Sequence, residues 1–235
     1  MTDARGPLEP LPDRRTAGER LAVRLEPYRE QRPVVLALPR GGVPVAMEIA
    51  RRLDAPLDVL IVRKVGAPGN PEYGLGAVVE GGSRYLDEPR VRAAGYTVRE
   101  LGPTIAREQN EVDRRAREYR GDRPPVEVKD RTVIVVDDGV ATGGTLIAAL
   151  RALRGRGPRR LVAALGVAPP DTVELLRPEV DDLVVLLVPV MFFAVGEWYH
   201  QFAQLSDGEV REMLAEADAV GVAAVRRAGD RPTPP

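Results

Sequence analysis

Five short, nearly continuous apolar runs constrain the fold of this 235-residue chain more than any other feature. Strands with one solvent-exposed face alternate apolar and polar residues, whereas apolar runs without alternation are typical of parallel strands that are covered on both faces. Segments with helical periodicity lie between several of the runs, as in α/β proteins. We therefore predict an α/β, doubly wound, mainly parallel five-stranded sheet with helices on both faces. The predicted strands are 34–38, 57–62, 132–136, 161–167 and 183–188, and the predicted helices are 43–53, 144–153 and 171–176.

The length suits a single domain with its own core. The alternation of strands and helices breaks in the segment 66–125, where a Gly/Pro-rich stretch precedes a charged one. Long Gly/Pro-rich connections are often functional loops, and charges spaced at i, i+3 and i+4 predict a solvated helix. We expect one domain over 16–225, with a flexible loop and helical insertion at 66–125. The polar ends, 1–15 and 226–235, are predicted to be flexible tails.

Composition excludes several classes of function. Lys and Arg total 34 against 35 for Asp and Glu, so the chain offers no general field that would attract nucleic acid. Cysteine is absent and His200 is the single histidine, which excludes thiolate nucleophiles and multi-histidine metal sites. The longest apolar run, 183–195, is shorter than the ~20 residues that span a bilayer. Because the first residues also lack a signal-like apolar core, we expect a cytoplasmic protein without nucleic-acid or membrane partners.

The most informative motif is VIVVDDGVATGGT, residues 133–145. Two carboxylates, Asp137 and Asp138, end an apolar strand, and ligands of open α/β sheets bind at that end of the strands. They suit hydrogen bonds from neighbouring sugar hydroxyls. A small-residue loop before a helix can bind a phosphate through its N–H groups and the helix N-terminus, although an ordinary strand-to-helix turn is the alternative. The predicted phosphate-binding residues are Ala141, Thr142, Gly143, Gly144 and Thr145.

This segment resembles the phosphoribosyl diphosphate (PRPP) motif of type I phosphoribosyltransferases, most closely the adenine phosphoribosyltransferase version. The resemblance covers about 34–188 and implies the fold of that family. It also implies that Asp137 and Asp138 bind the ribose 2′ and 3′ hydroxyls and that 141–145 bind the 5′-phosphate. PRPP or a nucleoside monophosphate would then be the ligand, with Mg²⁺ as cofactor.

A second candidate anion site follows the first predicted strand. Pro39-Arg40-Gly41-Gly42 combines a permanent charge with two glycines that allow close backbone approach, just before a helix N-terminus. Pro and Gly pairs also mark ordinary turns. The family has its diphosphate loop here, often with a cis peptide, so the resemblance assigns Arg40, Gly41 and Gly42 to the diphosphate and places a cis bond between Arg40 and Gly41.

A third candidate is Arg63-Lys64, after the second predicted strand. A departing diphosphate needs charge neutralisation, and similar pairs occur in orotate and adenine phosphoribosyltransferases. Solvated surface cations are the alternative. The stretch 66–82 would be the family's flexible catalytic loop. Within it Glu72, in a Glu-Tyr-Gly sequence, is a candidate general acid/base beside the catalytic cations.

The C-terminal part concentrates aromatic residues, which make up only 4% of the chain. We expect 189–215 to form a hood whose aromatic residues stack on a planar base. Aromatic residues at this spacing more often fill a core or an oligomer interface, which leaves a homodimer open. Ala141 stands where hypoxanthine-guanine enzymes have an acid, which argues against a 6-oxopurine substrate. The candidate hood residues are Phe192, Phe193, Trp198 and Tyr199.

Two functions are consistent with these motifs. The first is Mg²⁺-dependent transfer of the 5-phosphoribosyl group between PRPP and an acceptor, expected to be a nitrogenous base, with release of diphosphate. The second is a non-catalytic regulator of the same fold that senses PRPP or a nucleotide. The motifs leave the acceptor open.

Overall fold

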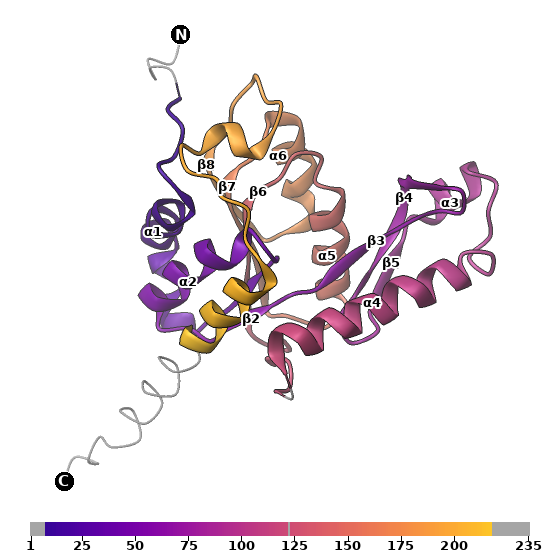
Figure 1. Cartoon of the computed structure of the whole chain (residues 1–235), viewed down its shortest axis with the longest axis horizontal. Helices are drawn as coiled ribbons and strands as arrows, with labels where there is room; N and C mark the ends of the chain where they lie inside the picture. The colour runs from indigo at the N-terminus through magenta and orange to yellow at the C-terminus, as the bar shows by residue number, and fades with distance from the viewer. Residues whose placement is uncertain (1–7, 122, 218–235) are drawn as a thin grey trace.

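The computed structural model describes residues 8–121 and 123–217. Its centre is a five-stranded sheet in the order β2-β1-β6-β7-β8, and every neighbouring pair is parallel (Figure 1). The five apolar runs therefore supply the five strands of this sheet, which confirms the predicted α/β class, although the strand predicted at 57–62 ends at Val59 in this sheet. The strands are β1 (Val34–Ala37), β2 (Leu57–Val59), β6 (Thr132–Gly139), β7 (Arg160–Val167) and β8 (Asp182–Leu187).

Helices cover both faces of this sheet, as Figure 1 shows. Alternate residues of a strand point to opposite faces. Val136 packs in the core that contains α1 (Arg14–Leu25) and α2 (Gly42–Leu53), whereas Val135 packs in the core that contains α5 (Gly144–Arg154) and α6 (Pro170–Leu176). Because β1, β6 and β7 bury side chains on both faces, continuous apolar runs were required in these strands, whereas the edge strand β8 is only partly buried.

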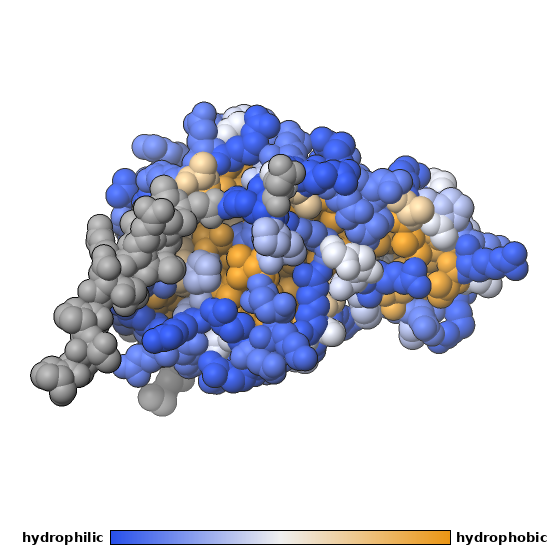
Figure 2. Space-filling model, turned by 90° about the horizontal axis from the view of Figure 1, so that it is seen from below, coloured by the Kyte–Doolittle hydropathy of each residue, from blue (hydrophilic) through white to orange (hydrophobic). Residues whose placement is uncertain are grey.

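A second, three-stranded sheet lies in an arm at the right of Figure 1, and the space-filling view of Figure 2 shows the arm projecting on the same side. Its antiparallel strands are β3 (Val62–Ala67), β4 (Asn70–Val79) and β5 (Arg84–Leu86). Most of residues 66–82, which were predicted to be an irregular loop, instead form the β3–β4 hairpin, and the flexibility of this segment stays a prediction. Gly69, with φ of 79°, allows the turn, and Leu75 is fully buried. The glycines and prolines in these strands interrupt the apolar pattern from which strands are predicted.

Two helices complete the arm, α3 (Glu88–Ala93) and α4 (Gly102–Arg120). The charged stretch is helical as predicted, but α4 is not solvated on all sides, since Val112 is fully buried. Arg120, also buried, places Nε 2.9 Å from Asp58 Oδ1 and Nη2 2.9 Å from Glu80 Oε2. These ion pairs tie the end of α4 to the edge of the central sheet.

Packed structure begins earlier in the sequence than predicted. Leu11 is fully buried and its N–H donates to Trp198 O at 2.8 Å. Asp13 caps α1 by accepting from the Thr16 N–H at 2.7 Å. The predicted flexible tail over 1–15 is thus wrong for residues 11–15, because an apolar side chain in a Pro-rich stretch anchors it. Residues 1–7 and the predicted tail 226–235 lie outside the described residues.

The chain after β8 returns over the body in the orange and yellow segment of Figure 1. It contains a 3-10 helix (Val195–Trp198) and an α-helix over 207–217. Two other 3-10 helices, Glu26–Gln31 and Arg177–Glu179, connect elements of the core. Over the described ranges, no helix combines the length and apolarity needed to cross a bilayer.

Candidate functional site

A cavity of about 330 Å³ lies at the carboxyl end of β6, and we call it the loop cavity. Asp137 and the connection 139–146 form one wall, while residues 38–39 and 60–62 form the other. The motif predicted from sequence is therefore brought together in one cavity. All five predicted phosphate-binding residues line it: Ala141, Thr142, Gly143, Gly144 and Thr145.

The connection from β6 to α5 has the features of an anion site. The first turn of a helix leaves its N–H groups without intrahelical acceptors, and the helix dipole favours negative charge there. Gly143, the N-cap of α5, has φ of 74°, which suits glycine. The Thr172 hydroxyl donates to Ala141 O, so α6 fixes the loop from behind. The loop is thus anchored from behind while its residues line the cavity.

Asp137 is the acid that lines the loop cavity. Burial raises its pKa well above the ordinary value, and the charge of Asp138 raises that pKa further. The Asp138 N–H donates to Asp137 Oδ1 at 2.9 Å and partly offsets these effects. A desolvated carboxylate of this kind gains from additional hydrogen-bond donors. Sugar hydroxyls would supply such donors.

Asp138 does not line the loop cavity, because adjacent residues of a strand point to opposite faces. Its Oδ2 accepts from Arg14 Nε at 2.7 Å, and both side chains are nearly buried. Arg14 also donates to Ala203 O at 2.7 Å, and its guanidinium carbon lies 3.8 Å from the centroid of the Phe202 ring. Sequence reasoning missed Arg14, since nothing in its local pattern distinguishes it from the other arginines of α1.

The predicted diphosphate loop connects β1 to α2. Gly41 is the N-cap of α2, and a Cβ at this position would lie 2.0 Å from Asp138 Oδ2. At Gly42 a Cβ would lie 2.5 Å from Val136 O, so both glycines allow close packing on β6. Arg40 is half-exposed, with Nη1 3.9 Å from Asp207 Oδ1. The cis peptide bond precedes Arg40, after Pro39, and not between Arg40 and Gly41 as expected.

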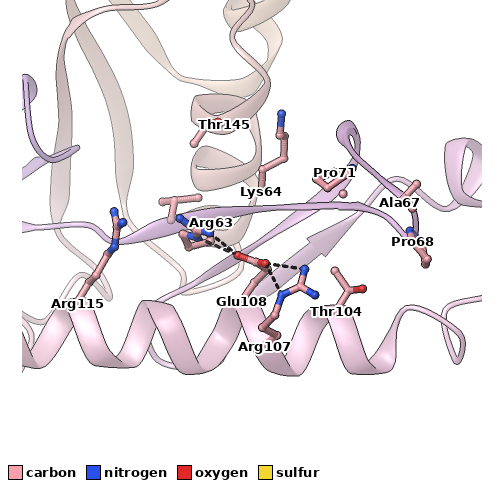
Figure 3. Close-up of a pocket in the computed structure, with 13 residues that line it drawn as sticks. Arg63, Lys64, Ala67, Pro68, Pro71, Thr104, Arg107, Glu108, Arg115 and Thr145 are labelled. Atoms are coloured by element: carbon pink, nitrogen blue, oxygen red, sulfur yellow. Dashed lines mark hydrogen bonds and ion pairs between the residues drawn. The ribbon is translucent and has the colours of Figure 1, made fainter.

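A second cavity, of about 390 Å³, lies between the β3–β4 hairpin and α4, and we call it the arm pocket (Figure 3). Arg63 and Lys64 both line it, but they leave the strand on opposite sides. Arg63 Nε lies 2.9 Å from Glu108 Oε2, and Arg107 Nη2 lies 3.0 Å from Glu108 Oε1. The Arg63 and Arg107 side chains lower the pKa of Glu108 against the opposing effect of burial. The pocket is therefore rich in cations around one ionised acid.

Glu72 lies on β4, on the hairpin that borders the arm pocket. Its side chain is outside the part of the chain that the structure describes. Its assignment as a general acid/base stays a prediction.

The four aromatic residues of the predicted hood do not come together over the loop cavity, and none of them lines either cavity. Phe193 is 79% exposed, whereas Phe192 and Trp198 pack against the core. Tyr199 is buried, and its hydroxyl donates to Asp138 O at 2.5 Å. In this arrangement Tyr199 supports the acid pair from behind. Base stacking by the other three stays a prediction.

Comparison with known proteins gives consistent matches. The sequence model for "Phosphoribosyl transferase domain" matches residues 9–187. A Mycobacterium tuberculosis protein named "Putative phosphoribosyl transferase Rv0571c" is 41% identical over 222 residues, which cover 94% of this chain and 50% of that protein. The chain thus spans about half the length of this curated relative. A uracil phosphoribosyltransferase of Brevibacillus brevis is 36% identical over 84 residues, covering 36% of this chain and 38% of that protein.

One solved structure matches almost the whole fold. The crystal structure of TT1426 from Thermus thermophilus is 48% identical, with a TM-score of 0.80. The match covers 88% of this chain and 98% of that one.

Proposed function

Because the chain belongs to the phosphoribosyltransferase family and has its type I fold, we propose that it transfers the 5-phosphoribosyl group between PRPP and a nitrogenous base, with release of diphosphate. One observation carries the proposal: a desolvated acid, Asp137, and an anchored Thr/Gly loop line one cavity, and this cavity adjoins a second that is lined by cations. A sugar with a phosphate at one end and a diphosphate at the other matches this pattern of donors and charges.

The proposed ligand placement follows the two cavities. The 5′-phosphate binds to the N–H groups and hydroxyls of 141–145, at the N-terminus of α5. A ribose hydroxyl donates to Asp137. Asp138, held by Arg14, completes the acid pair behind it. The diphosphate extends toward Arg63 and Lys64 in the arm pocket; residues 40–42 line neither cavity, and their contact with the diphosphate stays a prediction.

In the proposed reaction a nitrogen of the base forms a bond to ribose C1 as the bond from C1 to the diphosphate oxygen breaks. The electron pair of that bond leaves with the diphosphate. Arg63 and Lys64 stabilise the added negative charge, which is the main electrostatic demand of the step. The proton released from the base nitrogen passes to a general base, for which Glu72 is the candidate.

Magnesium fits the donors of this site. Mg²⁺ is commonly held by one or two carboxylates together with substrate phosphates and water. Asp137 is the carboxylate on the loop cavity that could take part. When bound, the metal would neutralise part of the diphosphate charge.

A sensing role is the second candidate, and a specific observation favours it. The cations needed for transfer are engaged by the protein's own acids: Arg63 by Glu108, and Arg40, more distantly, by Asp207. A regulator could bind PRPP without releasing these pairs. A measurement of catalytic turnover therefore distinguishes the transferase from the regulator.

Diphosphate release tests the proposal. Purified protein is incubated with PRPP, Mg²⁺ and each of adenine, guanine, hypoxanthine and uracil, and diphosphate is measured with an enzyme-coupled assay. We expect release with at least one base and none with Asp137→Asn, which keeps the size of the side chain. PRPP binding without release from any base would instead support the sensor.

A further inference from the structure

Arg115, on α4, is the one charged residue that lines both cavities in the described part of the chain. Figure 3 shows its side chain rising from α4 beside β3, apart from the Arg63, Glu108 and Arg107 group. Two uncharged residues, Val62 and Thr145, are also shared by the two cavities. Arg115 therefore lies at the boundary between the loop cavity and the arm pocket.

The loop cavity needs a cation at this boundary. Among the described residues that line it, Asp137 is the acid and Arg115 is the sole Lys or Arg. A phosphate dianion beside a carboxylate brings like charges together in a recess with reduced access to water, which is costly without a compensating cation. The helix N-terminus supplies only about half a unit charge. Arg115 can supply a full one.

Arg115 is oriented by its own helix. Its Nε donates to Glu111 Oε1 at 2.8 Å, and Arg114 binds the same carboxylate. These two arginines lower the pKa of Glu111 to about 2, so that this acid is ionised at neutral pH. The bond uses one of the five N–H groups of a guanidinium, whose planar fork suits two phosphate oxygens. Both arginines share this anchor, but only Arg115 lines the cavities.

We propose that Arg115 is a substrate-binding residue that contacts PRPP where its sugar-phosphate and diphosphate parts meet, and so selects ligands that carry both. The inference rests on the proposed function. It adds a residue from the arm to a site otherwise built from the β6–α5 loop and the β3 cations. It also gives the arm a role, since α4 holds this side chain over both cavities.

The test compares Arg115→Gln with Arg114→Gln, its neighbour and matched control. Titration calorimetry with Mg²⁺ measures binding of PRPP and of ribose 5-phosphate to each protein. We expect Arg115→Gln to weaken PRPP binding at least tenfold and ribose 5-phosphate binding by a smaller factor. Arg114→Gln should bind both within twofold of the parent. Arg115→Lys keeps the positive charge but lacks the planar guanidinium, so it should bind PRPP more tightly than Arg115→Gln and more weakly than the parent. This variant replaces Arg115→Gln in the test if the glutamine variant does not fold.

The outcomes separate the two proposals. If the parent binds PRPP and Arg115→Gln binds it within twofold, the role of Arg115 is refuted and the proposed function stands. Equal losses in the Arg114 and Arg115 variants would also refute it, because the effect would then come from Glu111 or from the helix. If the parent binds neither PRPP nor ribose 5-phosphate, the proposed function itself fails, and the role of Arg115 fails with it.

Discussion

Replacing Arg14 with alanine should destabilise the fold, because this residue joins three parts of the chain. From α1 it pairs with Asp138 at the end of β6. It also donates to the Ala203 carbonyl and stacks on the Phe202 ring in the C-terminal segment. Alanine would remove all three contacts and leave the Asp138 carboxylate nearly buried beside Asp137 without its cation.

The magnitude follows from the burial of the pair, whose side chains are only 12% and 10% exposed. Removing one partner of a buried ion pair costs about 3–5 kcal/mol. Because a little solvent reaches this pair, we expect about 3 kcal/mol for Arg14→Ala. For a chain of this size each kcal/mol lowers the unfolding temperature by about 2–4 °C, so the expected fall is about 6–12 °C.

Thermal and urea unfolding of a double-mutant cycle with Asp138→Asn measures the pair directly. We expect an interaction free energy of at least about 1.5 kcal/mol between the two positions. Arg15→Ala is the control, since its side chain is 70% exposed and its ion pairs with Glu19 and Glu48 should be worth less than about 1 kcal/mol. Additive effects, or an Arg14→Ala loss no larger than that of Arg15→Ala, would refute the reasoning.

Three further predictions concern stability. The folded-state pKa of Asp137 is raised, so its ionisation lowers the stability of the fold as pH rises above the unfolded pKa of about 3.9. Asp137→Asn should therefore have an unfolding temperature a few degrees above that of the parent at pH 7.5, and this difference should vanish near pH 3. A difference that does not change with pH over this range would contradict the prediction. Gly166→Ala should cost about 2 kcal/mol or more by denaturant unfolding, because its Cβ would lie 2.0 Å from the Tyr199 hydroxyl oxygen, whereas Gly102→Ala, with open space around it, should cost almost nothing. Arg120→Ala should cost about 3–5 kcal/mol and increase hydrogen exchange in the arm, since two buried acids lose their cation; exchange that is unchanged there would contradict this role.

The central fold could be predicted from sequence because its signal is local and redundant. The three inner strands β1, β6 and β7 are buried on both faces, so residues such as Val135 and Val136 had to be apolar together. The arm could not be predicted in the same way. Its strands carry glycines for close packing, as at Gly76, where a Cβ would lie 2.2 Å from Tyr85 O, and these residues have the composition of a loop.

The same distinction between local and long-range signals applies to the residues of the candidate site. The acid and the Thr/Gly loop are contiguous in sequence and belong to one strand-turn-helix unit, and both Asp137 and the loop line the loop cavity. Arg14 and Arg115 reach the site from distant segments, and only tertiary packing brings them there. For Tyr199 the sequence left base stacking and core packing open, and the structure shows a buried side chain whose hydroxyl donates to Asp138 O.

Calorimetric titration of PRPP with Mg²⁺ tests the central claim most directly. The parent protein should bind PRPP with a stoichiometry of about one per chain, and Asp137→Asn should weaken this binding at least tenfold by removing the charged acceptor of the ribose hydroxyl. Asp171→Asn, a change at an exposed position on α6, should leave it unchanged. No binding by the parent, or equal affinity in the Asp137 variant, would contradict the account.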